Sequence, residues 1–128
     1  MSDLVSQNLN MIFKTPKGET VHALKDLNFT LKKGELLTVL GPSGCGKTTL
    51  LNITAGFIRP TSGNITLNNK EIDGPGVERG MVFQQGALFE WLTVAENVNF
   101  GLRMKNEDPI KTQKKVDEWL EIVGLKGF

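Results

Sequence analysis

The sequence is short of the residues that mark several protein classes. Its 128 residues include one cysteine, Cys45, so no internal disulfide can form, which fits a reducing cytosol. Fifteen Lys and Arg residues stand against 14 Asp and Glu residues, a net charge of +1 that gives no electrostatic reason to expect nucleic acid as a partner. The one histidine, His22, belongs to no partner motif and is expected to be a solvated strand residue.

The sequence also gives no reason to expect a membrane segment or a leader. Residues 36–58 carry a single charge, but they contain four glycines and a proline, and Lys47 lies midway, where burial in lipid is costly. The first ten residues, MSDLVSQNLN, carry Asp3 and no apolar core, so we expect no signal peptide. A length of 128 residues suits one domain with a modest core.

What the sequence does contain is a glycine-rich loop between an apolar run and a helical pattern. Residues 41–48, GPSGCGKT, match the phosphate-binding pattern G-x-x-x-x-G-K-S/T. The apolar run at residues 36–40 predicts a buried parallel strand, and the apolar spacing after residue 47 predicts a helix with one packed face. A glycine-rich turn can fit the pattern by chance, but chance does not also supply the flanking strand and helix. The segment therefore predicts nucleotide binding.

The residue types of this phosphate loop suit a polyphosphate for physical reasons. Glycines without a Cβ let backbone N–H donors approach phosphate oxygens, and the N-terminus of the following helix adds partial positive charge. Lys47 is expected to contact the β- and γ-phosphates, and the Thr48 hydroxyl to bind Mg²⁺. The residues of this segment predicted to bind nucleotide are Gly41, Pro42, Ser43, Gly44, Cys45, Gly46, Lys47, Thr48 and Thr49.

Alternating apolar residues predict strands on both sides of this segment. Residues 9–13 and 21–31 are expected to be strands paired with each other, separated by a turn with Pro16 and Gly18. Residues 65–72 are expected to form a short antiparallel ribbon. Residues 81–83 are expected to form a brief core strand.

Two helices are expected in the last third of the chain. Thr93 and Glu96 form a capping-box pattern that opens a helix toward Met104. Asp108 followed by proline predicts the start of a second helix, which Gly124 would end. The apolar face expected for this second helix, with Trp119 in the core, consists of Val116, Trp119, Leu120 and Val123.

A family resemblance rests on three segments in a fixed order. They are GPSGCGKTTLLNITAGFIRPTSGNITLN at residues 41–68, GMVFQQGALFEWLTVAENVNFGL at residues 80–102, and a helix ending in VGL. Together they resemble the first half of the ATP-binding subunit of an ABC transporter, from about residue 11 to the last residue. GPGVERGMVFQ followed by Leu88 and Trp91 is similar to the nitrate/sulfonate/taurine importer branch, although Glu90 stands where that branch often has proline.

The resemblance implies an α/β fold, the N-terminal part of a P-loop NTPase of the ABC ATPase type, truncated. It would combine an antiparallel β subdomain, the phosphate-loop strand and helix of the core sheet, and the start of a helical subdomain. Residues 1–128 would then be the N-terminal half of one ATP-binding domain. The implied parts are residues 1–35 and 63–73 (β subdomain), 36–58 (strand and helix), 81–92 (Q-loop region) and 93–128 (start of the helical subdomain).

The resemblance also implies roles for single residues, with ATP and Mg²⁺ as cofactors. Phe13 stands where the family places an aromatic side chain that stacks on adenine, and packing in the core is the alternative. Gln84 matches the glutamine that binds Mg²⁺ or the attacking water, and a polar strand end is the alternative; Gln85 is the weaker candidate. Lys47 and Gln84 are the implied catalytic residues.

The implied partners are those of an importer motor. They are a second ATP-binding subunit in a homodimer, two transmembrane permease subunits and, indirectly, a solute-binding protein, at the cytoplasmic face of the plasma (inner) membrane as a peripheral subunit. Leu88, Phe89, Trp91 and Leu92 either form an apolar patch that meets a permease loop or pack inside the helical subdomain, and both interpretations stay open.

The family's hydrolysis machinery is not all in these residues. It needs an apolar strand ending in Asp-Glu, an LSGGQ-type signature and a switch histidine, and Asp117-Glu118 follow a charged stretch instead. We therefore expect an ATPase that powers solute import in the full-length parent, and a fragment that binds ATP weakly without turnover and folds marginally. The alternatives are a non-catalytic ATP-binding or regulatory module and a soluble ATPase acting on nucleic acid or protein assemblies, which the neutral charge disfavours.

Overall fold

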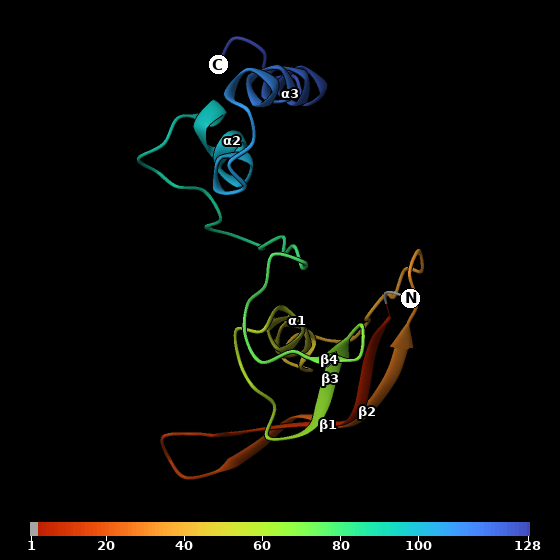
Figure 1. The fold of residues 1–128 in the computed structure, drawn as a ribbon. Coiled ribbons are helices and arrows are strands. Elements are labelled where there is room, and N and C mark those ends of the chain that lie inside the picture. Colours follow the sequence, from red (N-terminus) through yellow and green to blue (C-terminus); the bar gives the residue numbers. More distant parts are fainter. Residues whose placement is uncertain (1–2) are drawn as a thin grey trace. The chain divides into compact units, whose positions relative to one another are not determined.

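The computed structural model describes residues 3–128, which form two compact units (Figure 1). The first unit ends at Met81, and the second is Val82–Phe128. The first combines an antiparallel sheet with one helix, and the second consists of two helices and the loops around them. Among these described residues, no helix has the length and hydropathy that a membrane crossing requires.

The sheet of the first unit is antiparallel throughout and has the strand order β2-β1-β3-β4. Both expected pairings are confirmed: the two long strands form a hairpin, and the ribbon turns at Asn68 and Asn69. Those two asparagines have φ of 54° and 63°, the left-handed torsions that a two-residue hairpin turn requires. The strands are β1 (Leu4–Lys14), β2 (Thr20–Leu31), β3 (Ser62–Leu67) and β4 (Lys70–Glu71).

The core of the first unit lies between this sheet and helix α1 (Lys47–Ala55). Leu50 and Ile53 of the helix are buried, as the helical spacing predicts, whereas Leu51 between them is half exposed. Gly56, in a left-handed conformation, ends the helix before residues 57 and 58, which were expected to continue it. The buried cluster consists of Leu9, Leu50, Ile53, Ile65 and Ile72.

Two expected strands are absent from residues 3–128. Residues 36–40 have no regular structure, and Leu36 and Leu40 are 91% and 86% exposed. Residues 81–83 are also irregular, and Val82 is 96% exposed. A strand exists only when a neighbour satisfies its backbone groups, and none of the described strands pairs with either segment. The two strands predicted from apolar composition, at residues 36–40 and 81–83, are therefore wrong.

The second unit pairs helices α2 (Val94–Met104) and α3 (Pro109–Ile122) around Leu102, Val116 and Leu120. The predicted caps are confirmed. Thr93 accepts from the backbone N–H of Glu96 and Glu96 accepts from that of Thr93, while the Asp108 side chain accepts from the N–H of Ile110. The prediction that Trp119 lies in the core is wrong, because its side chain is 44% exposed beside the buried stripe.

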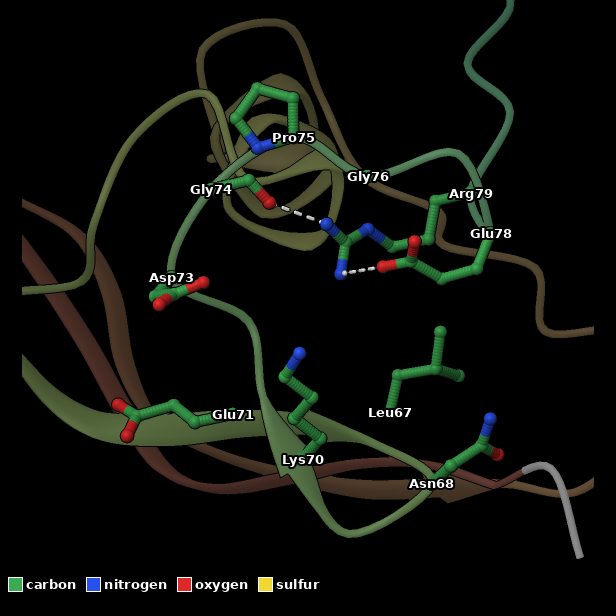
Figure 2. Close-up of a pocket in the computed structure, with 10 residues that line it drawn as sticks. All are labelled: Leu67, Asn68, Lys70, Glu71, Asp73, Gly74, Pro75, Gly76, Glu78 and Arg79. Carbon is green, nitrogen blue, oxygen red and sulfur yellow. Dashed lines mark hydrogen bonds and ion pairs between the residues drawn. The ribbon is translucent and has the colours of Figure 1, made fainter. Parts of the chain in front are cut away.

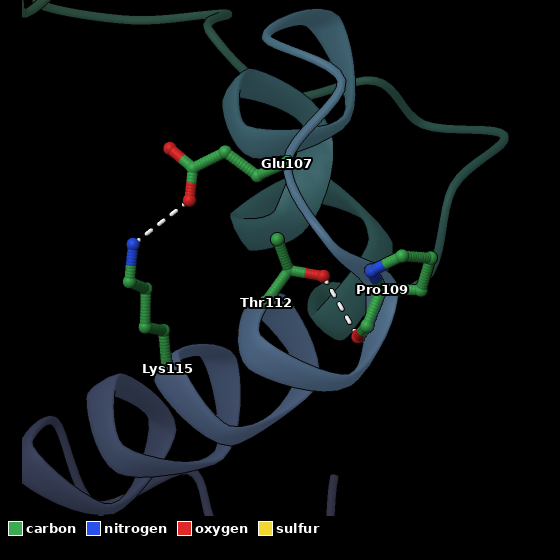
Figure 3. A network of polar contacts seen from close by, with 4 residues as sticks. All are labelled: Glu107, Pro109, Thr112 and Lys115. Carbon is green, nitrogen blue, oxygen red and sulfur yellow. Dashed lines mark hydrogen bonds and ion pairs between the residues drawn. The ribbon is translucent and has the colours of Figure 1, made fainter.

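Polar contacts hold the corner between these two helices (Figure 3). Lys115 Nζ lies 2.8 Å from Glu107 Oε2, and Thr112 Oγ1 donates to the carbonyl of Pro109 at 2.9 Å. The hydrogen bond from Lys115 lowers the pKa of Glu107. The hydrogen bonds from Thr93 likewise lower the pKa of Glu96 at the other end of α2. Both carboxylates therefore favour the folded helix pair when they are ionised.

Candidate phosphate-binding site and its setting

The phosphate loop is shaped by its main chain. Gly44 and Gly46 have φ of 80° and 100°, a region that side chains with a Cβ disfavour. Gly46 is the N-cap of α1, and a Cβ there would collide with the carbonyl oxygen of Ala23 in β2. Within the described chain, no side chain caps the first turn of α1. The N–H groups at this helix end therefore point into the loop without a side-chain acceptor.

Lys47 folds over the loop from the first position of α1. Its Nζ donates to the carbonyl oxygens of Gly41 at 2.6 Å and Pro42 at 2.7 Å, and it lies 3.4 Å from Cys45 Sγ. The backbone N–H of Cys45 donates to Pro42 at 3.3 Å, which closes the turn. The structure thus brings the ammonium group and the predicted loop residues into one small region.

A cavity of about 350 Å³ lies beside the loop. Its walls include Leu27 and Phe29 of β2, the irregular segment 37–40, and Cys45, Gly46 and Lys47 from the loop and α1. Most of the walls are apolar, so this cavity suits further apolar side chains better than a polyphosphate. Ser43 and Gly44, which the sequence predicts to bind phosphate, instead lie exposed.

A second cavity, of about 380 Å³, contains no loop residue (Figure 2). Arg79 crosses it, donating to the carbonyl of Gly74 and lying 3.1 Å from Glu78 Oε1. Glu71 and Asp73 also line it, so its carboxylates outnumber Arg79 and Lys70. A polyphosphate would meet net repulsion there, which leaves residues 41–49 as the phosphate-binding candidate.

The two predicted site residues outside the loop lie elsewhere in the chain. Phe13 is near the end of β1, paired with Val21 of β2, and is 41% exposed, so it is not the core residue of the alternative interpretation. Gln84 is exposed in an irregular segment of the second unit. Thr48 is exposed and Thr49 half-buried in the first turn of α1. The roles of Phe13 with adenine and of Thr48 and Gln84 with Mg²⁺ stay predictions.

Among residues 3–128, no group of three or more His, Cys, Asp or Glu side chains is arranged to hold a metal ion. A hydroxyl and an amide oxygen would suit Mg²⁺, which favours hard oxygen ligands and takes part of its shell from phosphates.

The loop before α2 presents apolar side chains to solvent. Leu88 and Trp91 are 75% and 80% exposed, while the ring of Phe89 packs on those of Phe100 and Trp91 at centroid distances of 4.5 and 5.4 Å. The sequence left open whether these side chains form an exposed patch or pack inside the subdomain: Leu88 and Trp91 are exposed, whereas Phe89 and Leu92 are half-buried. It missed Asn97, whose side chain holds the loop. The available signal was an asparagine inside a helix, where its amide competes for backbone groups.

The comparisons with known proteins agree with this architecture. Residues 24–128, most of the chain, match the family described as ABC transporter, and the chain belongs to that family. The resemblance inferred from the sequence is therefore confirmed.

Two close relatives are taurine import ATP-binding proteins named TauB. All 128 residues align at 89% identity with the protein of Pelagibacter ubique (strain HTCC1062) and at 59% with that of Roseobacter denitrificans (strain ATCC 33942 / OCh 114). The chain covers 48% of each, so it spans about half the length of the curated relatives it matches.

Solved structures confirm the expected fold class. The dimeric structure of MJ0796, a bacterial ABC transporter cassette, matches with a TM-score of 0.82 and 30% identity, over 97% of this chain and 58% of that one. A dimeric post-hydrolysis state of the same cassette, bound to ADP and Pi, matches with a TM-score of 0.81, 30% identity and the same coverage.

Proposed function

We propose that this chain forms the phosphate-binding part of the ATP-binding subunit of an ABC importer, in which ATP hydrolysis powers solute uptake. The observation that carries the proposal is the phosphate loop at the start of α1, with Lys47 beside backbone N–H groups that no side chain caps within the described residues. Anions bind at such helix ends because the N–H groups and the helix dipole both favour negative charge.

Each loop residue has a distinct part in this proposal. Gly44 and Gly46 let the backbone curve around the β-phosphate, and Lys47 exchanges its carbonyl contacts for oxygens of the β- and γ-phosphates. The Thr48 hydroxyl, exposed at the first turn, and Gln84 would hold Mg²⁺. When bound, that ion neutralises charge that develops on the phosphates. Phe13, exposed on β1, would stack on the adenine.

The relatives support a proposal for the solute and partners of the complete protein. Because the protein at 89% identity is a taurine import ATP-binding protein, we propose taurine as the solute. We further propose that the subunit works as a dimer beneath two permease subunits, at the cytoplasmic face of the inner membrane, with a solute-binding protein delivering taurine. The dimeric structures of MJ0796, a similar cassette, support the homodimer.

Calorimetry with ATP and Mg²⁺ tests the site on the complete subunit that carries this sequence. Lys47→Ala should weaken ATP binding roughly a hundredfold, because charge-assisted hydrogen bonds to phosphate contribute about 1.5–3 kcal/mol. Lys33→Ala, at an exposed turn, is the matched control and should bind ATP like the wild type. Unchanged affinity in Lys47→Ala would contradict the proposal. Uptake of taurine, compared with nitrate, by the complex in vesicles tests the solute.

A further inference from the structure

The C-terminal end of helix α1 lies directly against another backbone segment of the first unit. Gly56, with φ of 84°, is the C-cap of the helix. The three heavy atoms nearest to a Cβ at this position would all be backbone atoms, of Gly74 and Pro75, and the Gly74 carbonyl would collide with it. The helix has nine residues and is about 13 Å long, so this contact lies one short helix away from the phosphate loop.

Arg79 holds the segment that lies against this helix end. Its Nη2 donates to the carbonyl oxygen of Gly74, and its Nη1 lies 3.1 Å from Glu78 Oε1 (Figure 2). The Arg79 side chain is 13% exposed. Arg59 also reaches this turn, at the carbonyl of Asp73, but at 3.4 Å and from an exposed position. The main attachment of the turn is therefore that of Arg79.

The positive charge of Arg79 suits the end of a helix. The last carbonyl groups of a helix carry partial negative charge, and a further carbonyl beside them adds to it. Helix α1 has no basic residue in its last turn, so it supplies no opposite charge of its own. The guanidinium that is bonded to the Gly74 carbonyl, beside Gly56, supplies this charge from another segment of the same unit.

The contacts of Arg79 predict which residues can replace it. Its Nε is buried and has no hydrogen-bond partner among residues 3–128, so the guanidinium uses only part of its donors. A lysine keeps the positive charge and an N–H donor for Gly74. A methionine keeps the apolar stem but removes the charge and every donor. These two substitutions therefore separate the polar contact from the packing of the side chain.

We propose that Arg79 is a positioning residue for phosphate binding, which acts from the end of α1 that is opposite to the phosphate loop. This inference rests on the proposed function. While Arg79 holds Gly74 against Gly56, α1 is fixed at its far end, so Lys47 and the N–H groups of the first turn keep their place. Donors that are already ordered bind a ligand more tightly, because less entropy is lost on binding.

The first test measures the helix without nucleotide, in the complete subunit that carries this sequence. Hydrogen exchange of α1 peptides, followed by mass spectrometry, should be roughly tenfold faster in Arg79→Met, because a helix that is not held opens more often. Arg79→Lys should exchange like the wild type. Arg103→Met, at an exposed arginine of α2, is the matched control and should leave α1 unchanged. Exchange that is unaffected by Arg79→Met, or equally fast in Arg79→Lys, would overturn the inference.

The second test measures phosphate binding by calorimetry with ATP and Mg²⁺. Arg79→Met should weaken ATP binding roughly tenfold, and Arg79→Lys at most about twofold. In a Lys47→Ala background the effect of Arg79→Met should shrink to less than about threefold, because a positioning residue acts through the group that it positions. If Arg79→Met does not fold, Arg79→Gln, which keeps a donor without the charge, replaces it with a roughly threefold effect.

Two results of the calorimetry would overturn the inference. One is an equal effect of Arg79→Met with and without Lys47. The other is an unchanged ATP affinity together with a lowered free energy of unfolding, which would make Arg79 a structural residue only. If the wild-type subunit binds no ATP, the proposed function fails instead, and the exchange measurement still decides whether Arg79 holds α1.

Discussion

The phosphate loop and the loop of residues 88–92 both lead into a helix, but their helices begin in opposite ways. At α1 the N-cap is Gly46, which offers no side-chain acceptor, and main-chain torsions shape the loop. At α2 the N-cap is Thr93, whose capping box with Glu96 occupies the helix end, and the side chain of Asn97 shapes the loop before it. The first helix end remains open to an anion, whereas the second is closed by its own residues.

The two helix ends therefore leave different groups available: backbone N–H donors at α1, and only side chains at α2. A phosphate needs backbone N–H groups in a concave turn, so glycines without side chains suit the first loop. In the second loop the backbone groups of Phe89 are already paired with the Asn97 side chain. Substitutions should accordingly act through backbone strain and the core in the first unit, and through lost side-chain hydrogen bonds in the second.

The largest expected effect is on the core beneath the phosphate loop. Leu9 is fully buried in β1, and Leu9→Ala should lower the free energy of unfolding of the first unit by about 3 kcal/mol through the cavity it leaves. Urea titration followed by circular dichroism would measure it. Both tryptophans, Trp91 and Trp119, belong to the second unit, so the midpoint of the fluorescence transition should move much less. Equal shifts by both probes would remove the distinction between the units.

A pair of glycine variants tests the role of main-chain torsions. Gly44→Ala should cost about 1 kcal/mol, because alanine disfavours positive φ. Gly46→Ala should cost about 2–3 kcal/mol, since its Cβ would also meet the Ala23 carbonyl. Urea titration of the first unit measures both, and equal costs would show that the close approach to β2 is unimportant.

Removing the capping box tests how much it stabilises the start of α2. Thr93→Ala removes the acceptor for the Glu96 N–H and should destabilise α2 by about 1 kcal/mol. The fluorescence transition of the second unit should move to lower urea, with the first unit unchanged. A transition at the wild-type midpoint would mean that Asn97 alone secures the start of α2.

Acidification should lower the stability of the second unit, and this is the smallest of the expected effects. Hydrogen bonds from Thr93 lower the pKa of Glu96, and the one from Lys115 lowers that of Glu107, in both cases from 4.5. A lowered pKa in the folded state means that this stabilisation is complete above pH 4.5 and is lost as the pH falls through the lowered value. Thermal melts of the second unit at pH 6 and pH 3.5 measure the loss, which Glu107→Gln should reduce.

Local patterns predicted the features that depend on neighbours in sequence. The phosphate loop, the capping box at Thr93 and the Asp108 cap each involve residues within a few positions, and the structure forms all three. The strands expected at residues 36–40 and 81–83 depend on pairing with distant segments, and none of the described strands provides it.

The burial and contacts of single side chains were harder to predict than the positions of helices and strands. Trp119 lies on the apolar side of the α3 pattern, but the small core of the second unit is filled by Leu102, Val116 and Leu120, which leaves the large ring half exposed. The contacts of Asn97 depend on the conformation of a loop eight residues earlier, which no periodicity encodes.

The close approach of Gly46 to Ala23 has a mechanical consequence. The nearest atom to this position is the Ala23 carbonyl oxygen, which belongs to the main chain of β2 and cannot rotate away as a side chain can. A shift of the loop at Gly46 would therefore bear on the main chain of β2, which is paired with β1 from Leu4 to Lys14.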